Sequence, residues 1–242
     1  MLWLKKKSDP FKTASFLKTD IHSHLIPGLD DGSPSIEESL NICKELVRLG
    51  YKKAVTTPHV MQDAYGVKTE MIVSGTLELN KFVADNQIDF EIIPSAEYYA
   101  DEQFIELIRT RDLLPFNENH LLFETSYLNK PRFLTELIFE IQTASYKPVL
   151  AHPERYLYLL EDESLIEDLR SRGVLFQLNI NSFLGVYSSH SRKLAKKLWK
   201  NNLVDFLGSD CHSYKQALLL EKSLSLPLFN SIEGSGILNN KL

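Results

Sequence analysis

The sequence has little cysteine, no long apolar run and no basic excess, and each of these absences narrows the possible functions. Its 242 residues include two cysteines, Cys43 and Cys211, so the framework of a disulfide-stabilised secreted protein is missing and a reducing cytoplasm fits. No segment approaches the length of a membrane span. The formal net charge of −5 differs from the basic excess of nucleic-acid-binding proteins. We therefore expect a cytoplasmic globular protein with no transmembrane segment and no nucleic-acid partner.

Several familiar catalytic motifs are also missing. The sequence has no GxxxxGK[ST] phosphate loop, no GxGxxG after a predicted strand and no GxSxG nucleophile elbow. A cysteine-dependent phosphatase needs a thiolate in a loop that ends in arginine. Cys43 lies on the apolar face of a predicted helix, and no arginine closely follows Cys211. We interpret both cysteines as non-nucleophilic.

The first residues, MLWLKKKSDPF, contain three lysines without a following apolar run. They therefore do not have the pattern of a secretory signal. A tryptophan and a leucine beside lysines could touch a membrane surface, but a solvated tail is the favoured interpretation. We expect a flexible N-terminal extension over residues 1–17 and a single domain over residues 18–242.

Short apolar runs alternate with amphipathic segments through the rest of the chain. Apolar residues recur at helical spacing across Ser35–Leu49. Ser35 and Glu38 have the spacing of a capping box, and Gly50 is placed to end the helix. Further helices are expected at Thr69–Asn86, Pro131–Ser145, Asp162–Arg172 and His190–Asn202. Strands are expected at Lys18–Ile21, Ala54–Thr57, Phe90–Pro94, Leu121–Phe123, Pro148–Ala151, Val174–Leu178 and Val204–Leu207.

This alternation of strands and helices favours an α/β fold with parallel strands and helical crossovers. A barrel close to the (β/α)8 type, with seven strands, is the leading architecture. An open doubly wound sheet is the alternative.

Histidines and acids gather where the predicted strands end. The first strand runs into DIHSHLIPGLDDGS, and five of the seven histidines lie at or just after strand ends. His120 and His190 are the exceptions. The carboxyl ends of parallel barrel strands converge on one face, where such folds carry their chemistry. We therefore expect these side chains to meet there: His22, His24, His59, Glu97, Glu124, His152, Asp210 and His212.

Imidazole nitrogens and carboxylate oxygens are ligands for manganese, iron and zinc. Residues i and i+2 of a strand point to the same side, so His22 and His24 can reach one ion together, and so can Asp210 and His212. A single histidine after a strand is usually an ordinary polar turn residue. Two such pairs on different strands, with further acids and histidines beside them, favour a metal site instead.

The motifs DIHSHLIPGLDDGS, TPH, SAEYY, LLFETS, AHPER and GSDCH, in this order, resemble the PHP (polymerase and histidinol phosphatase) superfamily. They most resemble its bacterial protein-tyrosine phosphatases of capsule and exopolysaccharide biosynthesis. The resemblance runs from about residue 18 to the C-terminus. It implies a distorted TIM-like (β/α)7 barrel of the PHP type. It also implies three divalent metal ions, usually manganese, with iron and zinc as alternatives.

The resemblance also implies a role for individual residues. Asp30 would shape the loop before the helix at Ser35, a role that Asp31 could share. Arg155 would contact the substrate phosphate, the alternative being a surface salt bridge. We assign catalysis to Arg155, His59 and His212, without choosing the general acid. The implied metal ligands are His22, His24, Glu97 and Asp210 for one ion, Glu97, Glu124 and His152 for a second, and Asp31, His59 and His212 for a third.

The sequence departs from the family pattern at one place. Related sequences commonly have a second arginine five residues after the last motif histidine, where this chain has Ala217. Lys215 is close enough in sequence to supply a charge to the phosphate, although it could equally be a solvated helix residue. The departure leaves the implied ligand set intact, but it puts the efficiency and the choice of substrate in question.

The activity that the resemblance implies is metal-dependent hydrolysis of phosphotyrosine on a protein, without a covalent phosphoenzyme. The implied protein substrate is a tyrosine kinase that controls polysaccharide biosynthesis, and homo-oligomers occur in the family. Two alternatives remain open. One is another PHP phosphoesterase, acting on histidinol phosphate or a small metabolite. The other is a weakly active regulatory module that keeps its metals, which the missing arginine at Ala217 would explain.

Overall fold

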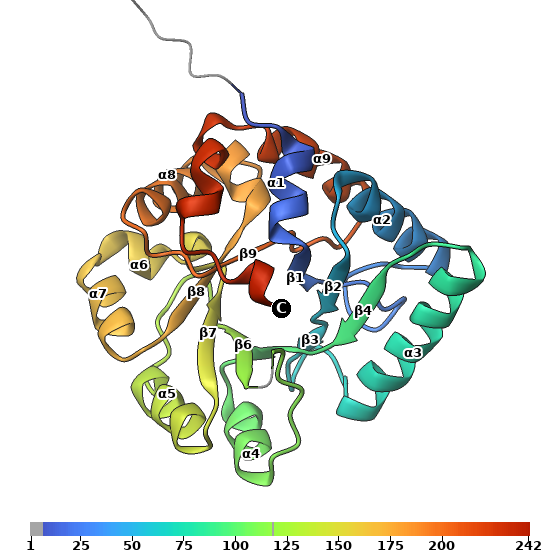
Figure 1. Ribbon diagram of the computed structural model, residues 1–242. Coiled ribbons are helices and arrows are strands. Elements are labelled where there is room, and N and C mark those ends of the chain that lie inside the picture. The colour runs from blue at the N-terminus through green and yellow to red at the C-terminus, as the bar shows by residue number, and fades with distance from the viewer. Residues whose placement is uncertain (1–6, 118) are drawn as a thin grey trace, which may run out of the picture.

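The computed structural model describes residues 7–117 and 119–242, in which helices surround a central ring of strands (Figure 1). One parallel sheet has the order β1 (Thr19–Ser23), β2 (Lys53–Thr56) and β4 (Glu91–Pro94). A second parallel sheet has the order β3 (His59–Val60), β5 (Glu97–Tyr99), β6 (His120–Glu124), β7 (Lys147–Ala151), β8 (Leu175–Asn179) and β9 (Phe206–Gly208).

Two of the seven chain segments that cross the ring are interrupted, which explains why the ring contains two sheets. Strands β2 and β3 are separated by Thr57 and Pro58, and β4 and β5 by Ser95 and Ala96. Before the interruptions β2 pairs with β4, and after them β3 pairs with β5. A parallel bridge between Ser23 and Cys211 joins the two sheets on the other side. The distorted seven-stranded barrel is confirmed, and the open doubly wound sheet is wrong.

Figure 1 shows the helices as an outer layer around the strands. The five expected helices are confirmed to within a few residues, whereas α1, α4, α6 and α9 were not expected. None of the helices in the described part of the chain combines the length and apolar character needed to cross a bilayer. The α-helices are α1 (Pro10–Leu17), α2 (Ile36–Leu49), α3 (Thr69–Asp85), α4 (Glu102–Thr110), α5 (Leu134–Thr143), α6 (Leu157–Glu161), α7 (Ser164–Ser171), α8 (Ser189–Lys200) and α9 (Tyr214–Leu224). The 3-10 helices are η1 (Pro153–Arg155), η2 (Ile180–Leu184), η3 (Pro227–Gly234) and η4 (Asn239–Lys241).

Helix α2 shows how local sequence signals set the boundaries of a helix. The Ser35 hydroxyl accepts a hydrogen bond from the Glu38 amide at 3.3 Å. The Glu38 carboxylate does not close the expected capping box, because it accepts from the Tyr214 amide of α9 at 2.7 Å. Gly50 ends the helix at φ 115°. A Cβ there would lie 2.4 Å from the Ser15 hydroxyl, so glycine serves both the turn and the contact with α1.

The flexible extension expected over residues 1–17 must be corrected for residues 10–17, which form α1. The Asp9 carboxylate accepts hydrogen bonds from the Phe11 and Lys12 amides and so starts the helix. Ala14 and Leu17 are buried in the same hydrophobic core as α2 and α9. Residues 1–6 lie outside the described residues. The single domain over residues 18–242 remains a prediction.

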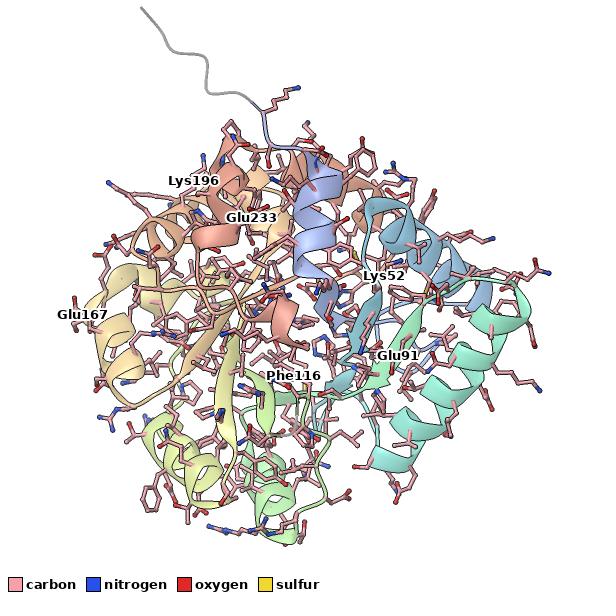
Figure 2. All side chains as sticks on the ribbon, in the orientation of Figure 1. Lys52, Glu91, Phe116, Glu167, Lys196 and Glu233 are labelled. Atoms are coloured by element: carbon pink, nitrogen blue, oxygen red, sulfur yellow. The ribbon has the colours of Figure 1, made fainter. Side chains whose placement is uncertain are left out.

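The interior of the barrel is apolar at the end where the strands begin. Seven buried side chains fill it, and Leu238 and Leu242 of the C-terminal segment pack against them. In Figure 1 the C-terminus lies at the centre of the ring. In Figure 2 Phe116 lies close to that centre, while Glu167 and Lys196 extend from the outer helices. The inner side chains are Ile21, Val55, Phe116, Leu122, Val149, Ala151 and Phe206. Because this end is filled and covered, the described interior of the barrel leaves room for a site at the other end of the strands.

Candidate metal centre

The carboxyl ends of the strands bring together all nine residues for which a ligand role is expected. His22 lies in β1, His59 and Glu97 begin β3 and β5, and Glu124 ends β6. His24 and His152 follow directly after β1 and β7, and Asp210 lies two residues after the end of β9. Donor atoms lie within 4.8 Å of one another in four overlapping groups, which are His22–His24–Asp210, His22–Glu97–His152, His59–Glu97–Glu124 and His24–Asp31–His59–His212.

Glu97 lies at the centre of these groups. Its Oε2 atom is 3.1 Å from His22 Nε2 and 3.5 Å from His24 Nε2. Asp210 Oδ1 is also 3.5 Å from each of these two nitrogens. Ligands about 2.1 Å from a metal in tetrahedral or octahedral geometry lie roughly 3.0–3.4 Å from each other. The distances from the two imidazoles to each of these acids therefore fit ligands of a divalent ion.

The second and third expected sets adjoin the first through Glu97 and His59. Glu97 Oε1 lies 2.9 Å from His152 Nε2, and Glu124 Oε2 lies 3.9 Å from the same nitrogen. His59 Nδ1 faces Glu124 Oε1 at 3.0 Å, and His59 Nε2 faces Asp31 Oδ1 at 3.5 Å. His212 Nε2 lies 3.6 Å from the same Asp31 oxygen. His24, expected in the first set alone, also lies within reach of the third.

Three buried polar atoms of the residues in these groups lack a hydrogen bond. One is His152 Nδ1, and the other two, His59 Nδ1 and Glu97 Oε1, lie a short distance from other donor atoms. Leaving such an atom unsatisfied costs about 1–3 kcal/mol, and more when the group is charged. A bound cation would satisfy the latter two atoms, so the donor set fits a metal better than it fits a hydrogen-bond network.

The electrostatics of the site indicate the same need for positive charge. Burial alone would lower the pKa of His22, but Glu97 and Asp210 raise it to about 9. Burial likewise opposes ionisation of Glu97, yet the surrounding imidazoles His22, His152 and His59 hold its pKa well below the usual range. Without metal, therefore, these acids would hold protons on neighbouring histidines. Divalent ions would supply the same positive charge.

Neighbouring side chains orient the first two histidines. His22 Nδ1 lies 2.7 Å from Gln177 Oε1, and His24 Nδ1 lies 2.7 Å from Asp30 Oδ2. These contacts leave Nε2 of both rings directed at the centre. Asp30 also accepts from the Gly32 amide at 2.9 Å, which confirms its expected role in the turn. Gln177 was not recognised in the sequence, because no spacing rule links it to His22.

The loop after β9 has an unusual backbone that places Asp210. Asp210 has φ 52°, a left-handed conformation that costs a residue other than glycine of order 1 kcal/mol and is common at functional sites. Both carboxylate oxygens of Asp20, in β1, accept hydrogen bonds from Ser209, at 2.8 and 2.5 Å. A Cβ at Gly208 would lie 2.6 Å from the His22 Cβ. Asp20 and Gly208 therefore hold β1 and β9 in register beside the site, and neither was recognised in the sequence.

Arg155 lies inside the site. Its Nη1 atom donates to Asp210 Oδ2 at 3.2 Å. Its guanidinium carbon lies 4.5 Å from the centre of the Tyr127 ring and 4.4 Å from the centre of the Tyr187 ring. A guanidinium between two aromatic faces is held by cation–π attraction. The sequence did not indicate either tyrosine, since both reach Arg155 through loops of unrelated strands.

The side chains of Lys215, Gln216 and Ala217 point in different directions. A cavity of about 300 Å³ over the centre is lined by Arg155, His212 and Gln216 among others, but not by Lys215. The Gln216 side-chain Oε1 atom accepts from the His212 backbone amide at 2.6 Å. Lys215 is exposed and Ala217 is fully buried. The predicted contact between Lys215 and the phosphate remains a prediction, and Gln216 is the polar side chain of α9 that reaches the cavity.

The comparison with known families rests on most of the chain. The family model described as capsular polysaccharide synthesis, CpsB/CapC, matches residues 18–219. The chain belongs to the CpsB/CapC family. It is 30% identical to the putative tyrosine-protein phosphatase CapC of Staphylococcus aureus over 85% of this chain and 81% of that one. It is 28% identical to the tyrosine-protein phosphatase YwqE of Bacillus subtilis over 81% of this chain and 78% of that one.

Solved structures agree with the CpsB/CapC assignment. A structure from a study of YwqE of Bacillus subtilis and CpsB of Streptococcus pneumoniae, described as metal-dependent tyrosine phosphatases, has a TM-score of 0.78 at 26% identity. It covers 92% of this chain and 94% of that chain. A histidinol phosphate phosphatase from Lactococcus lactis has a TM-score of 0.50 at 17% identity, covering 86% of this chain and 94% of that one. This second likeness concerns the fold alone, and it agrees with the expected fold of a histidinol phosphatase.

Proposed function

We propose that this chain is a metal-dependent protein-tyrosine phosphatase that acts in capsule or exopolysaccharide biosynthesis. The observation that carries the proposal is the convergence of nine histidine and carboxylate side chains at one end of the barrel, where Glu97 belongs to two of the four groups. The chain's relatives in the CpsB/CapC family are named tyrosine-protein phosphatases. The nine residues would hold about three divalent ions, with manganese as the favoured metal.

Bound ions would neutralise phosphate charge and supply hydroxide at neutral pH. The protein's own contribution to phosphate binding comes first from Arg155. A guanidinium has five N–H donors in a planar fork, and in Arg155 one of them is committed to Asp210. The remaining donors can bind phosphate oxygens in a bidentate manner. Tyr127 and Tyr187 would keep the fork aimed at the cavity, which lowers the entropic cost of binding.

His59 and His212 are the histidines best placed for proton transfer. Their side chains keep 13% and 20% of their exposure, whereas the side chains of His22 and His152 are almost completely buried. Both line the cavity over the centre. Of these two imidazoles, one that is not committed to a bound ion would deliver the proton to the leaving phenolate oxygen.

The protein substrate that we propose is a tyrosine kinase of polysaccharide biosynthesis, met in the cytoplasm. The family description supports a role in capsular polysaccharide synthesis. Cys43 and Cys211 are free thiols, which suits a reducing compartment. A homo-oligomer remains a proposal drawn from the family resemblance.

The test compares the turnover of a phosphotyrosine peptide and of histidinol phosphate by the manganese-loaded protein. We expect clear preference for the peptide, loss of activity in His152→Ala, and full activity in His190→Ala. His190 is a matched control because it is exposed at the start of α8 and is not part of the metal groups. Preference for histidinol phosphate would favour the alternative phosphoesterase. Peptide binding without release of phosphate would favour the regulatory module.

A further inference from the structure

A second cavity adjoins the one over the metal groups. Its volume is about 430 Å³, and it shares Asp31, His59 and Tyr127 with the first cavity. The two cavities therefore meet at the third expected ligand set. A substrate whose phosphate occupies the first cavity can extend directly into the second.

The outer walls of the second cavity are mainly aromatic. Tyr65, Tyr99 and Tyr127 line it, together with the apolar side chains of Met61 and Leu128. The Tyr65 ring stacks on the imidazole of His59, with 5.6 Å between ring centres and 12° between ring planes. The tyrosines come from the loop after β3, from β5 and from the loop after β6. Three separate segments thus place flat apolar surfaces beside one ligand group.

The hydroxyl groups of two of these rings interact with nearby protein groups. The Tyr65 hydroxyl interacts with Asp31, and the Tyr99 hydroxyl with Ser126. One face of the Tyr65 ring is covered by His59, so these side chains offer a ligand mainly the remaining surface of their rings. Pockets lined by aromatic faces, with few free polar groups, select apolar and aromatic ligands.

We propose that this tyrosine-lined cavity binds the aromatic ring of the substrate and so selects aryl over alkyl phosphomonoesters. The inference rests on the proposed function and deepens it. In an aryl phosphate the ring is bonded directly to the ester oxygen, so it must lie immediately beside the phosphate. An alkyl phosphate places a methylene group there and makes fewer contacts. Each aromatic pair is worth roughly two- to tenfold in affinity, so two or three rings give a substantial preference.

The test measures binding by calorimetry, so that it does not depend on turnover. The probes are phenylphosphonate and propylphosphonate, titrated into the metal-loaded protein. We expect phenylphosphonate to bind about tenfold more tightly, and Tyr99→Ala to abolish most of this preference. Tyr99→Phe, which keeps the ring, should retain it. Tyr146→Ala is the control, because Tyr146 precedes β7 at the opposite end of the barrel.

The failures of the two proposals can be told apart. Equal affinities for the two phosphonates, or an unchanged affinity ratio in Tyr99→Ala, would overturn the role of the cavity even if a phosphotyrosine peptide is hydrolysed. If the protein hydrolyses no phosphomonoester but binds phenylphosphonate more tightly, with the preference lost in Tyr99→Ala, the proposed function fails and the cavity keeps its role. A weaker binding of both probes to the same extent in Tyr99→Ala would indicate a structural role and would also contradict the inference.

Discussion

The two ends of the barrel contain buried histidines in opposite settings. Where the strands end, His22 lies against Glu97 and Asp210, and these acids raise its pKa to about 9. Where they begin, His120 stacks on Phe116 with 5.4 Å between ring centres, and burial lowers its pKa. One ring belongs to a candidate metal centre and the other to an apolar core. The comparison teaches that neighbouring groups, and not the residue type, decide what a buried histidine does.

The largest effect should come from the acid at the centre of the polar end. Glu97→Gln keeps the shape but removes the charge that faces His22, His24, His59 and His152. We expect kcat/KM for a phosphotyrosine peptide to fall on the order of a thousandfold. The control is Glu91→Gln, an exposed acid of β4 that pairs with Lys53. If both variants kept wild-type activity, the central role of Glu97 would be refuted.

Removal of metal should also destabilise the protein. Without cations the carboxylates at the strand ends depend on protonated histidines for compensation. Saturating metal should raise the melting temperature by about 5–10 °C compared with the chelated protein. This is the stabilisation expected when the free metal concentration is about a hundred times the dissociation constant. The shift should shrink in Glu97→Gln. Identical melting curves with and without chelator would speak against a tightly held cluster.

A variant at the apolar end should lower the stability of the protein without changing metal binding or activity. Asn239 accepts from the Leu207 amide at 2.9 Å, and its side-chain amide donates to the Thr19 and Leu207 carbonyls at 2.9 and 2.7 Å. Asn239→Ala should lower the free energy of unfolding by about 2 kcal/mol. The loss, measured by urea unfolding, should be equal with and without metal, and kcat should not change. A coupled loss of metal would mean that the two ends are not independent.

The smallest expected effect is the contribution of His120 to the pH dependence of folding stability. Its folded-state pKa lies below the ordinary value of about 6.5, so the unfolded chain binds more protons as the pH falls below that value. The stability that the neutral ring contributes is full at pH 7 and is partly lost by pH 5, by less than about 1 kcal/mol. His120→Phe should lose less stability than the wild type over this range. Parallel pH profiles for the two proteins would contradict the assignment.

The sequence predicts the barrel well because two of its signals are local. Apolar runs marked the seven segments that cross the ring, and the caps at Ser35 and Gly50 marked α2. The interruptions after Thr56 and Pro94 could not be predicted, because they create the two- and three-residue strands β3 and β5. These two short strands depend on pairing with neighbouring strands, and no local sequence pattern predicts that pairing.

Eight of the nine candidate ligands could be predicted because histidine and acid pairs at strand ends are uncommon, whereas Asp31 was implied only by the family resemblance. The residues that support them could not. Gln177 holds His22, and Tyr127 and Tyr187 enclose Arg155, but all three are ordinary residue types far away in sequence. The sequence also could not predict which side chains of α9 face the cavity. It directs Gln216 to the cavity and leaves Lys215 exposed, which depends on how the helix packs.

The most direct test of the central claim is the metal content of the purified protein, measured by elemental analysis after extensive dialysis. The account predicts about three equivalents of divalent metal per chain, reduced in Glu97→Gln and in His152→Ala and unchanged in His190→Ala. A protein that retains less than about one equivalent after loading with manganese, iron or zinc would contradict it. So would a content that none of these variants alters.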